Sequence, residues 1–387
     1  MSRIVDKTGM LDIIWGSTLM GGGGGGSIRA GIQLLESFEK HHPDVPMEVE
    51  MLSVDEMEDD AYAASGTGLG APAAIVKVDF SKHAENTFKV LEELCVKNGV
   101  NLKYNYAVEL GGFSSFFPFL LALQTGKPAV DVDGTGRAVP AIQTLLLNVN
   151  DCPCSPLGLA NGENDKIAIE LADPCNAVLA ERISRDISGM FGNMVGIYGW
   201  VIDKKMMKER VCCGTMTLTE EIGKVLRTSK ANDADMFEEL TKAGLIDAKV
   251  ICKGTIQDII TETRNGFDFG TMVVKSDKTG EIYHVRYQNE NLLLQKKTDS
   301  GFEDMLTVPD LITMYCIDAN GDEYVVPRMP LSNADAKVGM KIAVGAVKVD
   351  EKWFINGTKW WDVWSECMDN IGYTGGHLGY DNVQAQE

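Results

Sequence analysis

The chain has 387 residues, which is long for a single hydrophobic core because one domain usually takes about 100–200 residues, so we expect two domains. Its apolar and charged fractions, 44% and 24%, are those of an ordinary globular protein and exclude a disordered or fibrous chain. The formal net charge of −20 opposes binding to nucleic acid or to an acidic membrane surface, because both are polyanionic.

The N-terminal segment and the cysteines indicate where the protein resides. Residues 1–7 show no apolar stretch behind a basic flank, and no segment approaches the roughly 18 uninterrupted apolar residues of a membrane span. The 9 cysteines are an odd number spread through a large chain, which is typical of reduced thiols. We therefore expect a cytoplasmic protein without a membrane-spanning segment.

Two helices separated by a run of glycines are predicted at the start of the chain. Apolar residues recur at helical spacing over 11–19, and the glycines of 21–26 then interrupt that helix. Ser27 is a suitable N-cap for a second helix that extends to about residue 40. The glycine run either is a flexible connector or brings its backbone amides to a polar ligand at the start of the second helix.

Strands and helices then alternate along the chain up to residue 147. Apolar runs and alternation predict strands at 46–53, 73–78, 105–110 and 128–132, and helical spacing predicts helices around 88–95, 114–123 and 139–147. Such a succession implies a parallel sheet whose crossover connections are right-handed.

Residues 150–165 are rich in Pro, Gly, Asn, Asp and Cys and mark the expected domain boundary, which gives domains at 1–165 and 166–387. Beyond it, a strand-like stretch at 166–171 and helices around 180–191 and 220–230 precede hairpin turn signals such as Asn320-Gly321. The predicted fold class is α/β, with an N-terminal parallel-sheet α/β domain that carries the site, followed by a β-rich α+β C-terminal domain.

Polar residues follow two of the predicted parallel strands. Glu109 ends one strand, and Asp131 and Asp133 end the next, shortly before Arg137. Ligands of open parallel sheets bind beyond the carboxyl ends of the strands, where three carboxylates would bind a cation, share a proton or be neutralised by Arg137. The alternative is that the two aspartates only cap the following turn and helix.

Other common signatures do not match. A P-loop needs a preceding strand and a following Gly-Lys-Ser/Thr, and the glycine run has neither. The Gly-Thr-Gly-Leu-Gly segment at 66–70 is followed by a predicted strand where a dinucleotide site requires a helix. No nucleotide cofactor is therefore expected. The cysteines and histidines show no standard zinc spacing, and whether any cysteine is catalytic stays open.

Several segments together are similar to one known family. In the first half these are the glycine run, 68–72, 109–112 and 127–140, where the sequence reads Lys-Pro-Ala-Val-Asp-Val-Asp-Gly-Thr-Gly-Arg-Ala-Val-Pro. They resemble the N-terminal domain of the S-methyl thiohydantoin desulfurase-like family. The segments 214–223, 288–292, 309–312 and 378–381 resemble its C-terminal domain. The resemblance covers nearly the whole chain in the right order.

This resemblance implies chemistry at the sulfur-bearing carbon of a thiohydantoin-like ring. We hypothesise a hydrolase-type desulfurase that acts on an S-methyl thiohydantoin-like or related cyclic amide or imide ring through carboxylate-activated water. Glu109 or Asp133 would be the base, Asp131 its partner or a metal ligand, and Arg137 would stabilise developing charge. A divalent metal on Asp131 and Asp133, with Glu109, is an option because oxygen-rich sites suit hard cations.

The substrate of this hypothesis is a small ring, which backbone amides of glycine-rich loops would contact. An alternative from another functional class is a non-catalytic ligand-binding or accessory subunit that works with a hydantoinase-like enzyme. Both hypotheses leave open a homo-oligomer or a hydantoinase-like partner. The glycines expected to bind the substrate are Gly24, Gly25, Gly70, Gly111, Gly112, Gly134 and Gly136.

Overall fold

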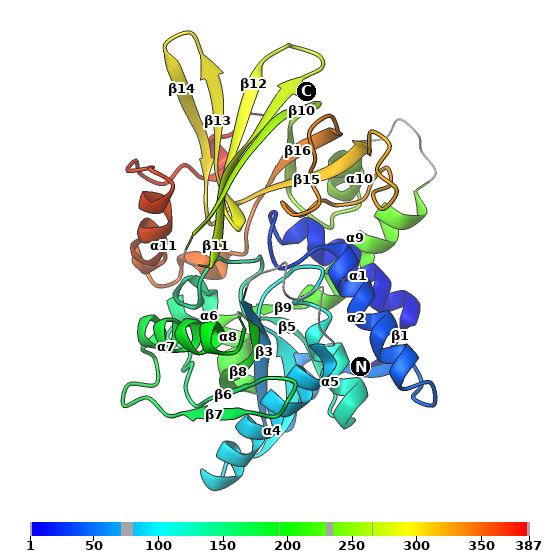
Figure 1. Cartoon of the computed structure of the whole chain (residues 1–387), viewed down its shortest axis with the longest axis vertical. Helices are drawn as coiled ribbons and strands as arrows, with labels where there is room; N and C mark the ends of the chain where they lie inside the picture. Colours follow the sequence, from blue (N-terminus) through cyan, green and yellow to red (C-terminus); the bar gives the residue numbers. More distant parts are fainter. Residues whose placement is uncertain (1, 71–79, 193, 230–234, 265, 385–387) are drawn as a thin grey trace.

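The computed structural model describes residues 2–70, 80–192, 194–229, 235–264 and 266–384. It contains a mixed β-sheet with helices around it, in the lower part of Figure 1, and an antiparallel sheet in the upper part. This arrangement confirms the predicted fold class.

The mixed sheet contains three of the predicted parallel strands, 46–53, 105–110 and 128–132, at its centre as β2, β4 and β5. Its order is β1-β2-β5-β4-β3-β8-β6-β7, with β9 beside β5. Neighbours among β2, β5, β4 and β3 are parallel, and the remaining pairs are antiparallel. The strands are β1 Arg3–Asp6, β2 Glu48–Leu52, β3 Tyr62–Gly70, β4 Leu102–Ala107, β5 Ala129–Asp133, β6 Leu157–Ala160, β7 Lys166–Ile169, β8 Met194–Asp203 and β9 Cys212–Cys213.

The second N-terminal helix begins where the sequence predicts, after Ser27, whereas the first begins at Lys7, ahead of the predicted range of 11–19. The side chain of Asp6 accepts a hydrogen bond from Gly9 N at 2.9 Å, and that of Ser27 accepts one from Ala30 N at 3.1 Å, so each helix has a capped first turn. The helices of this part are α1 Lys7–Met20, α2 Ile28–His41, α4 Phe80–Lys97, α5 Phe117–Thr125, α6 Leu146–Val149, α7 Ala177–Met190, α8 Lys204–Arg210 and α9 Thr215–Thr228.

Helices α1 and α9 pack directly against each other because two glycines remove side chains from their contact. A Cβ atom at Gly16 would lie 1.8 Å from Thr219 O, and one at Gly223 would lie 1.8 Å from Asp12 O. The Arg227 guanidinium then pairs with Asp12 at 2.6 Å and ties the same helices together.

One predicted helix is wrong, and five strands of the mixed sheet were missed. Residues 139–147 form a short 3₁₀ turn, Ile142–Thr144, and α6, because the extended backbone of Leu145 (ψ 139°) separates them. The Val139 and Ile142 amides donate to the side chains of Glu109 and Glu181. The strands β1, β3, β6, β8 and β9 were not predicted. The strand predicted at 73–78 lies outside the described residues.

The second sheet consists of antiparallel pairs, as the turn signals predict. Its order is β14-β13-β12-β11-β10-β16-β15. A tight turn at Asn289, whose φ is 57°, joins β12 to β13 and places Glu290 at the start of β13. The strands are β10 Ala248–Arg264, β11 Phe267–Ser276, β12 Ile282–Gln288, β13 Glu290–Thr298, β14 Gly301–Thr307, β15 Leu311–Asp318 and β16 Lys341–Val347, accompanied by the helices α10 Met236–Lys242 and α11 Lys359–Asn370.

The two sheets take their strands from separate parts of the chain. The last strand of the mixed sheet is β9, and the first of the antiparallel sheet is β10. The hairpin of β6 and β7, on either side of residue 165, belongs wholly to the mixed sheet. None of the helices in the described part of the chain combines the length and apolarity needed to cross a bilayer.

Candidate functional site

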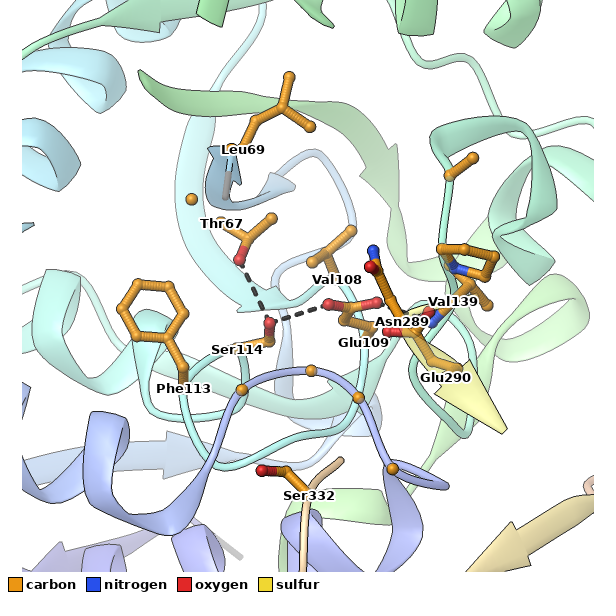
Figure 2. Close-up of a pocket in the computed structure, with 18 of the residues that line it drawn as sticks. Thr67, Leu69, Val108, Glu109, Phe113, Ser114, Val139, Asn289, Glu290 and Ser332 are labelled. Carbon is orange, nitrogen blue, oxygen red and sulfur yellow. Dashed lines mark hydrogen bonds between the residues drawn. The ribbon is translucent and has the colours of Figure 1, made fainter. Parts of the chain in front are cut away.

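A cavity of about 430 Å³ lies where the two sheets meet, and both parts of the chain line it. Figure 2 shows that Thr67, Glu109, Ser114 and Glu290 surround it. Its lining from the N-terminal part includes the glycine run, the end of β3, the loop after β4 and residues of 139–145; from the C-terminal part it includes Thr261 of β10, Asp268 of β11, Tyr287 of β12, Glu290 of β13 and residues 332–334.

The glycine run is held in place by hydrogen bonds from the C-terminal part of the chain. Asn291 N donates to Gly22 O and Asn333 N donates to Gly23 O, both at 2.8 Å. On the opposite side, Gly25 O accepts from two amides of the loop after β4, at 3.1 and 3.2 Å. Of the two interpretations open from the sequence, the hydrogen bonds therefore disfavour a flexible connector.

Space requires glycine at two positions of the run, and at one of them backbone conformation requires it as well. A Cβ atom at Gly24 would lie 1.9 Å from Glu290 Oε1, so only glycine leaves room for that carboxyl. A Cβ atom at Gly25, whose φ is +68°, would lie 2.3 Å from Leu110 O. The glycine run therefore places backbone atoms without side chains beside the cavity and beside Glu290.

Glu109 follows β4 directly and is half-buried in the cavity wall. Its Oε1 atom accepts a hydrogen bond from Ser114 Oγ at 2.9 Å, and its Oε2 atom accepts one from Val139 N at 3.0 Å. Burial raises the pKa of Glu109 to about 7, although these two hydrogen bonds and the charge of Arg137 lower it in part.

Glu290 reaches the same cavity from the antiparallel sheet. Its side chain is 3% exposed, and within the described residues its Oε2 atom has no hydrogen-bond partner. Burial, and then repulsion from Glu109, raise the pKa of Glu290 to about 8, while Arg137 lowers it. The Oε2 atom of Glu290 is therefore available for a hydrogen bond with a ligand atom in the cavity.

Two glutamates with raised pKa values therefore line the cavity. The pKa of Glu290 lies above that of Glu109, about 8 against about 7, and the negative charge of Glu109 contributes to this difference. Such a pair offers a base and an acid in one cavity without a histidine.

Arg137 is fully buried, but it does not line the cavity. Its Nη1 atom donates to Pro309 O at 2.6 Å and to Asp310 O at 3.2 Å, and its Nη2 atom donates to Asn291 O at 3.2 Å. The guanidinium therefore joins the loop after β5 to the antiparallel sheet. Its positive charge acts on both glutamates from behind the cavity wall.

Asp131 lies at the N-terminus of α9 and not in the cavity. Its Oδ1 atom accepts from the backbone amides of Met216 and Thr217 at 2.8 and 3.0 Å, and its Oδ2 atom accepts from Thr217 Oγ1 at 2.6 Å. These bonds use both carboxylate oxygens on the positive end of the helix, which is a capping role.

Asp133 is fully buried in the loop that follows β5, also away from the cavity. Its Oδ1 atom accepts from Thr135 N at 2.8 Å and from Gly136 N at 2.5 Å, and burial raises the pKa of Asp133 to about 7. The described residues contain no group of three or more His, Cys, Asp or Glu that could hold a metal ion, so the predicted cluster of Glu109, Asp131 and Asp133 does not form there.

The glycines predicted to bind substrate fall into three sets. Gly24, Gly25 and Gly70 line the cavity. Gly111 and Gly112 lie under the glycine run and α2, since their Cβ atoms would meet Gly25 O at 2.3 Å and Ser27 O at 2.5 Å. Gly134 and Gly136 shape the loop after β5, away from the cavity.

Sequence reasoning missed Glu290, Thr67 and Ser114 as cavity residues. Glu290 lies in the 288–292 segment, which carries a family resemblance. No local sequence pattern shows that this polar hairpin turn lies beside the cavity. Ser114 was expected at the start of a helix, and the segment of Thr67 was considered only as a dinucleotide-binding signature, whereas both residues lie on the cavity wall.

Comparison with known proteins identifies a family and a solved structure of similar fold. The model of the S-Me-THD-like N-terminal domain matches residues 8–170, and that of the S-Me-THD-like C-terminal domain matches 175–358. A crystal structure of a protein from Chromobacterium violaceum has the same fold, with a TM-score of 0.81, 22% sequence identity, and coverage of 98% of this chain and 100% of that chain. A search of curated proteins gives no match.

Proposed function

Because the chain belongs to the S-Me-THD-like family, we propose that it is a hydrolytic desulfurase whose substrate is an S-methyl thiohydantoin-like ring bound between its two sheets. The observation that carries this proposal is the Glu109–Glu290 pair, which combines a carboxylate and a carboxylic acid in one cavity. Hydrolytic loss of a thiol needs both, since water must lose a proton and the leaving sulfur must gain one.

Glu109 is the base in this proposal, because it has the lower pKa and is accessible from the cavity. The water oxygen bonds to the ring carbon while one of its protons passes to Glu109. The carbon–sulfur bond then breaks, and Glu290 gives its proton to the departing methanethiolate. The second water proton moves to the ring nitrogen as the carbonyl forms, and proton exchange between the glutamates restores the starting state.

The glycine run and the start of α2 would stabilise the charge that develops on the ring. The carbonyl groups of Gly22, Gly23 and Gly25 are turned toward other backbone amides, and residues 23–27 line the cavity just before α2 begins at Ile28. A helix N-terminus carries a partial positive charge and free N–H groups, which favour an anionic transition state over the neutral substrate.

The test is the release of methanethiol from a panel of S-methyl thiohydantoins by the wild-type protein and by Glu109→Gln and Glu290→Gln. A matched control is Glu36→Gln, because Glu36 lies on the exposed face of α2. We expect release by the wild type and control and a loss of about 10²-fold or more in each cavity variant.

Full release by both cavity variants would contradict the proposed mechanism. Binding of a ring compound that raises the melting temperature, without release of thiol, would instead favour a non-catalytic ligand-binding or accessory subunit.

A further inference from the structure

Three side-chain oxygens form a chain along the cavity wall. Thr67 Oγ1 lies 3.3 Å from Ser114 Oγ, and Ser114 Oγ lies 2.9 Å from Glu109 Oε1. Figure 2 shows the two contacts as a continuous path from Thr67 to Glu109. The chain therefore connects the proposed base to a second hydroxyl on the cavity surface.

The register of the parallel strands explains this juxtaposition. Gly66 of β3 pairs with Ala107 of β4, so Thr67 and Glu109 follow neighbouring positions in the sheet. β4 ends at Ala107, whereas β3 continues to Gly70, and the cavity opens where β4 turns away. Thr67 is half-buried there, in contact with the cavity.

Ser114 is the buried link between these two accessible groups, with 3% of its surface exposed. Its backbone amide donates to Gly25 O at 3.1 Å, beside the Phe113 amide, which donates to the same oxygen at 3.2 Å. The loop that carries Ser114 is thus fixed to the glycine run, and its hydroxyl is held toward Glu109.

The hydrogen bonds have one direction when Glu109 is ionised. A carboxylate only accepts, so Ser114 must donate its single hydroxyl proton to Glu109. Ser114 Oγ then accepts a hydrogen bond from Thr67 Oγ1, so the hydroxyl proton of Thr67 is also used in donation. Thr67 Oγ1 is left with lone pairs that can accept a hydrogen bond from a water molecule in the cavity.

We propose that Thr67 binds the attacking water and that Ser114 passes the water's proton from Thr67 to Glu109. This inference rests on the proposed function and adds the route by which the base acts. As the water oxygen bonds to the ring carbon, its proton moves to Thr67 Oγ1, the Thr67 proton moves to Ser114 Oγ, and the Ser114 proton moves to Glu109 Oε1. Both hydroxyls end with one proton, and the carboxylate becomes a carboxylic acid.

In the relay, Glu109 receives the proton through the hydrogen bond that Ser114 already donates to it. Ser114 is a positioning residue in this scheme, whereas Thr67 contacts the reacting water. Loss of the Thr67 hydroxyl and loss of the Ser114 hydroxyl should therefore affect the kinetics of thiol release differently.

The experiment compares Thr67→Val with Thr67→Ser, and Ser114→Ala with the wild type, by the pH dependence of methanethiol release. Thr67→Val is nearly isosteric and should lower kcat by about tenfold or more with little change in KM, whereas Thr67→Ser should restore the rate. Ser114→Ala should also move the acidic limb of the profile to higher pH, because the lost hydrogen bond favours ionised Glu109.

A second arm does not depend on turnover. The titration of Glu109, followed by NMR of ¹³C-labelled glutamate and assigned with Glu109→Gln, should shift to higher pH in Ser114→Ala. If the wild type releases no thiol, the desulfurase proposal fails, and this titration alone decides whether Ser114 is coupled to Glu109. Full kcat in Thr67→Val, or an unchanged Glu109 titration in Ser114→Ala, would overturn the relay.

Discussion

Replacement of Glu290 by Gln should stabilise the protein increasingly as the pH rises. The wild-type carboxyl is 3% exposed and lies near Glu109, so its ionisation inside the folded protein is unfavourable. In the unfolded chain the same group ionises freely. The amide of Gln has a similar size and remains neutral, so the variant does not lose stability through ionisation at this position.

The size of the effect follows from the pKa of Glu290, which is about 8 in the folded protein against a reference value of 4.5. Because the folded pKa is the higher one, the wild type keeps its full stability below about pH 4.5 and loses it up to about pH 8. Each pKa unit corresponds to about 1.4 kcal/mol, so the total loss is on the order of 5 kcal/mol.

Urea unfolding of wild type and Glu290→Gln between pH 5 and 8 measures this difference, since groups that do not interact with Glu290 cancel. Glu36→Gln is the control for the exchange of Glu by Gln, because Glu36 lies on the exposed face of α2. A pH-independent difference for Glu290→Gln would refute the reasoning, because it would mean that Glu290 ionises as easily in the folded protein as in the unfolded chain.

Three other substitutions test the surroundings of the pair. Gly24→Ala should cost about 1–3 kcal/mol, seen as a lower melting temperature, because its Cβ atom would lie 1.9 Å from Glu290 Oε1; an unchanged melting temperature would contradict this packing. Arg137→Met should lower the melting temperature and shift the Glu109 titration to higher pH, and a shift to lower pH would exclude the electrostatic role of Arg137. Asp131→Asn should cost about 0.5–2 kcal/mol in urea unfolding and leave thiol release intact, whereas loss of release in a folded variant would return Asp131 to the active site.

The parts of the fold that depend on local sequence could be predicted. Ser27 caps α2 as expected, because an N-cap needs only a side chain and the first turn of its own helix. The antiparallel character of the second sheet followed from turn residues and alternation, although Asn320-Gly321 lies in the long connection between β15 and β16 and not in a tight hairpin turn. Glu109 was located correctly at the end of a parallel strand, since strand order and polarity fix that edge of the sheet.

The rest depends on contacts between distant segments. Glu290 reaches Glu109 only because the antiparallel sheet packs against the glycine run, which no local pattern reveals. Residues 139–147 have helical spacing, but two of their amides bond to glutamates from elsewhere in the chain. Arg137 was predicted as a site residue because its own segment does not show that it bonds to three carbonyl groups of the C-terminal part.

The central claim is that Glu109 and Glu290 act as base and acid on one substrate, and the pH dependence of methanethiol release between pH 5 and 9 tests it most directly. We predict a bell-shaped profile whose rising limb reports Glu109 and whose falling limb reports Glu290, with pKa values of about 7 and 8 in the free protein. Glu109→Gln should abolish release, and Glu290→Gln should remove the falling limb along with most of the rate. Release that is flat across this range, or that survives in both variants, would contradict the account.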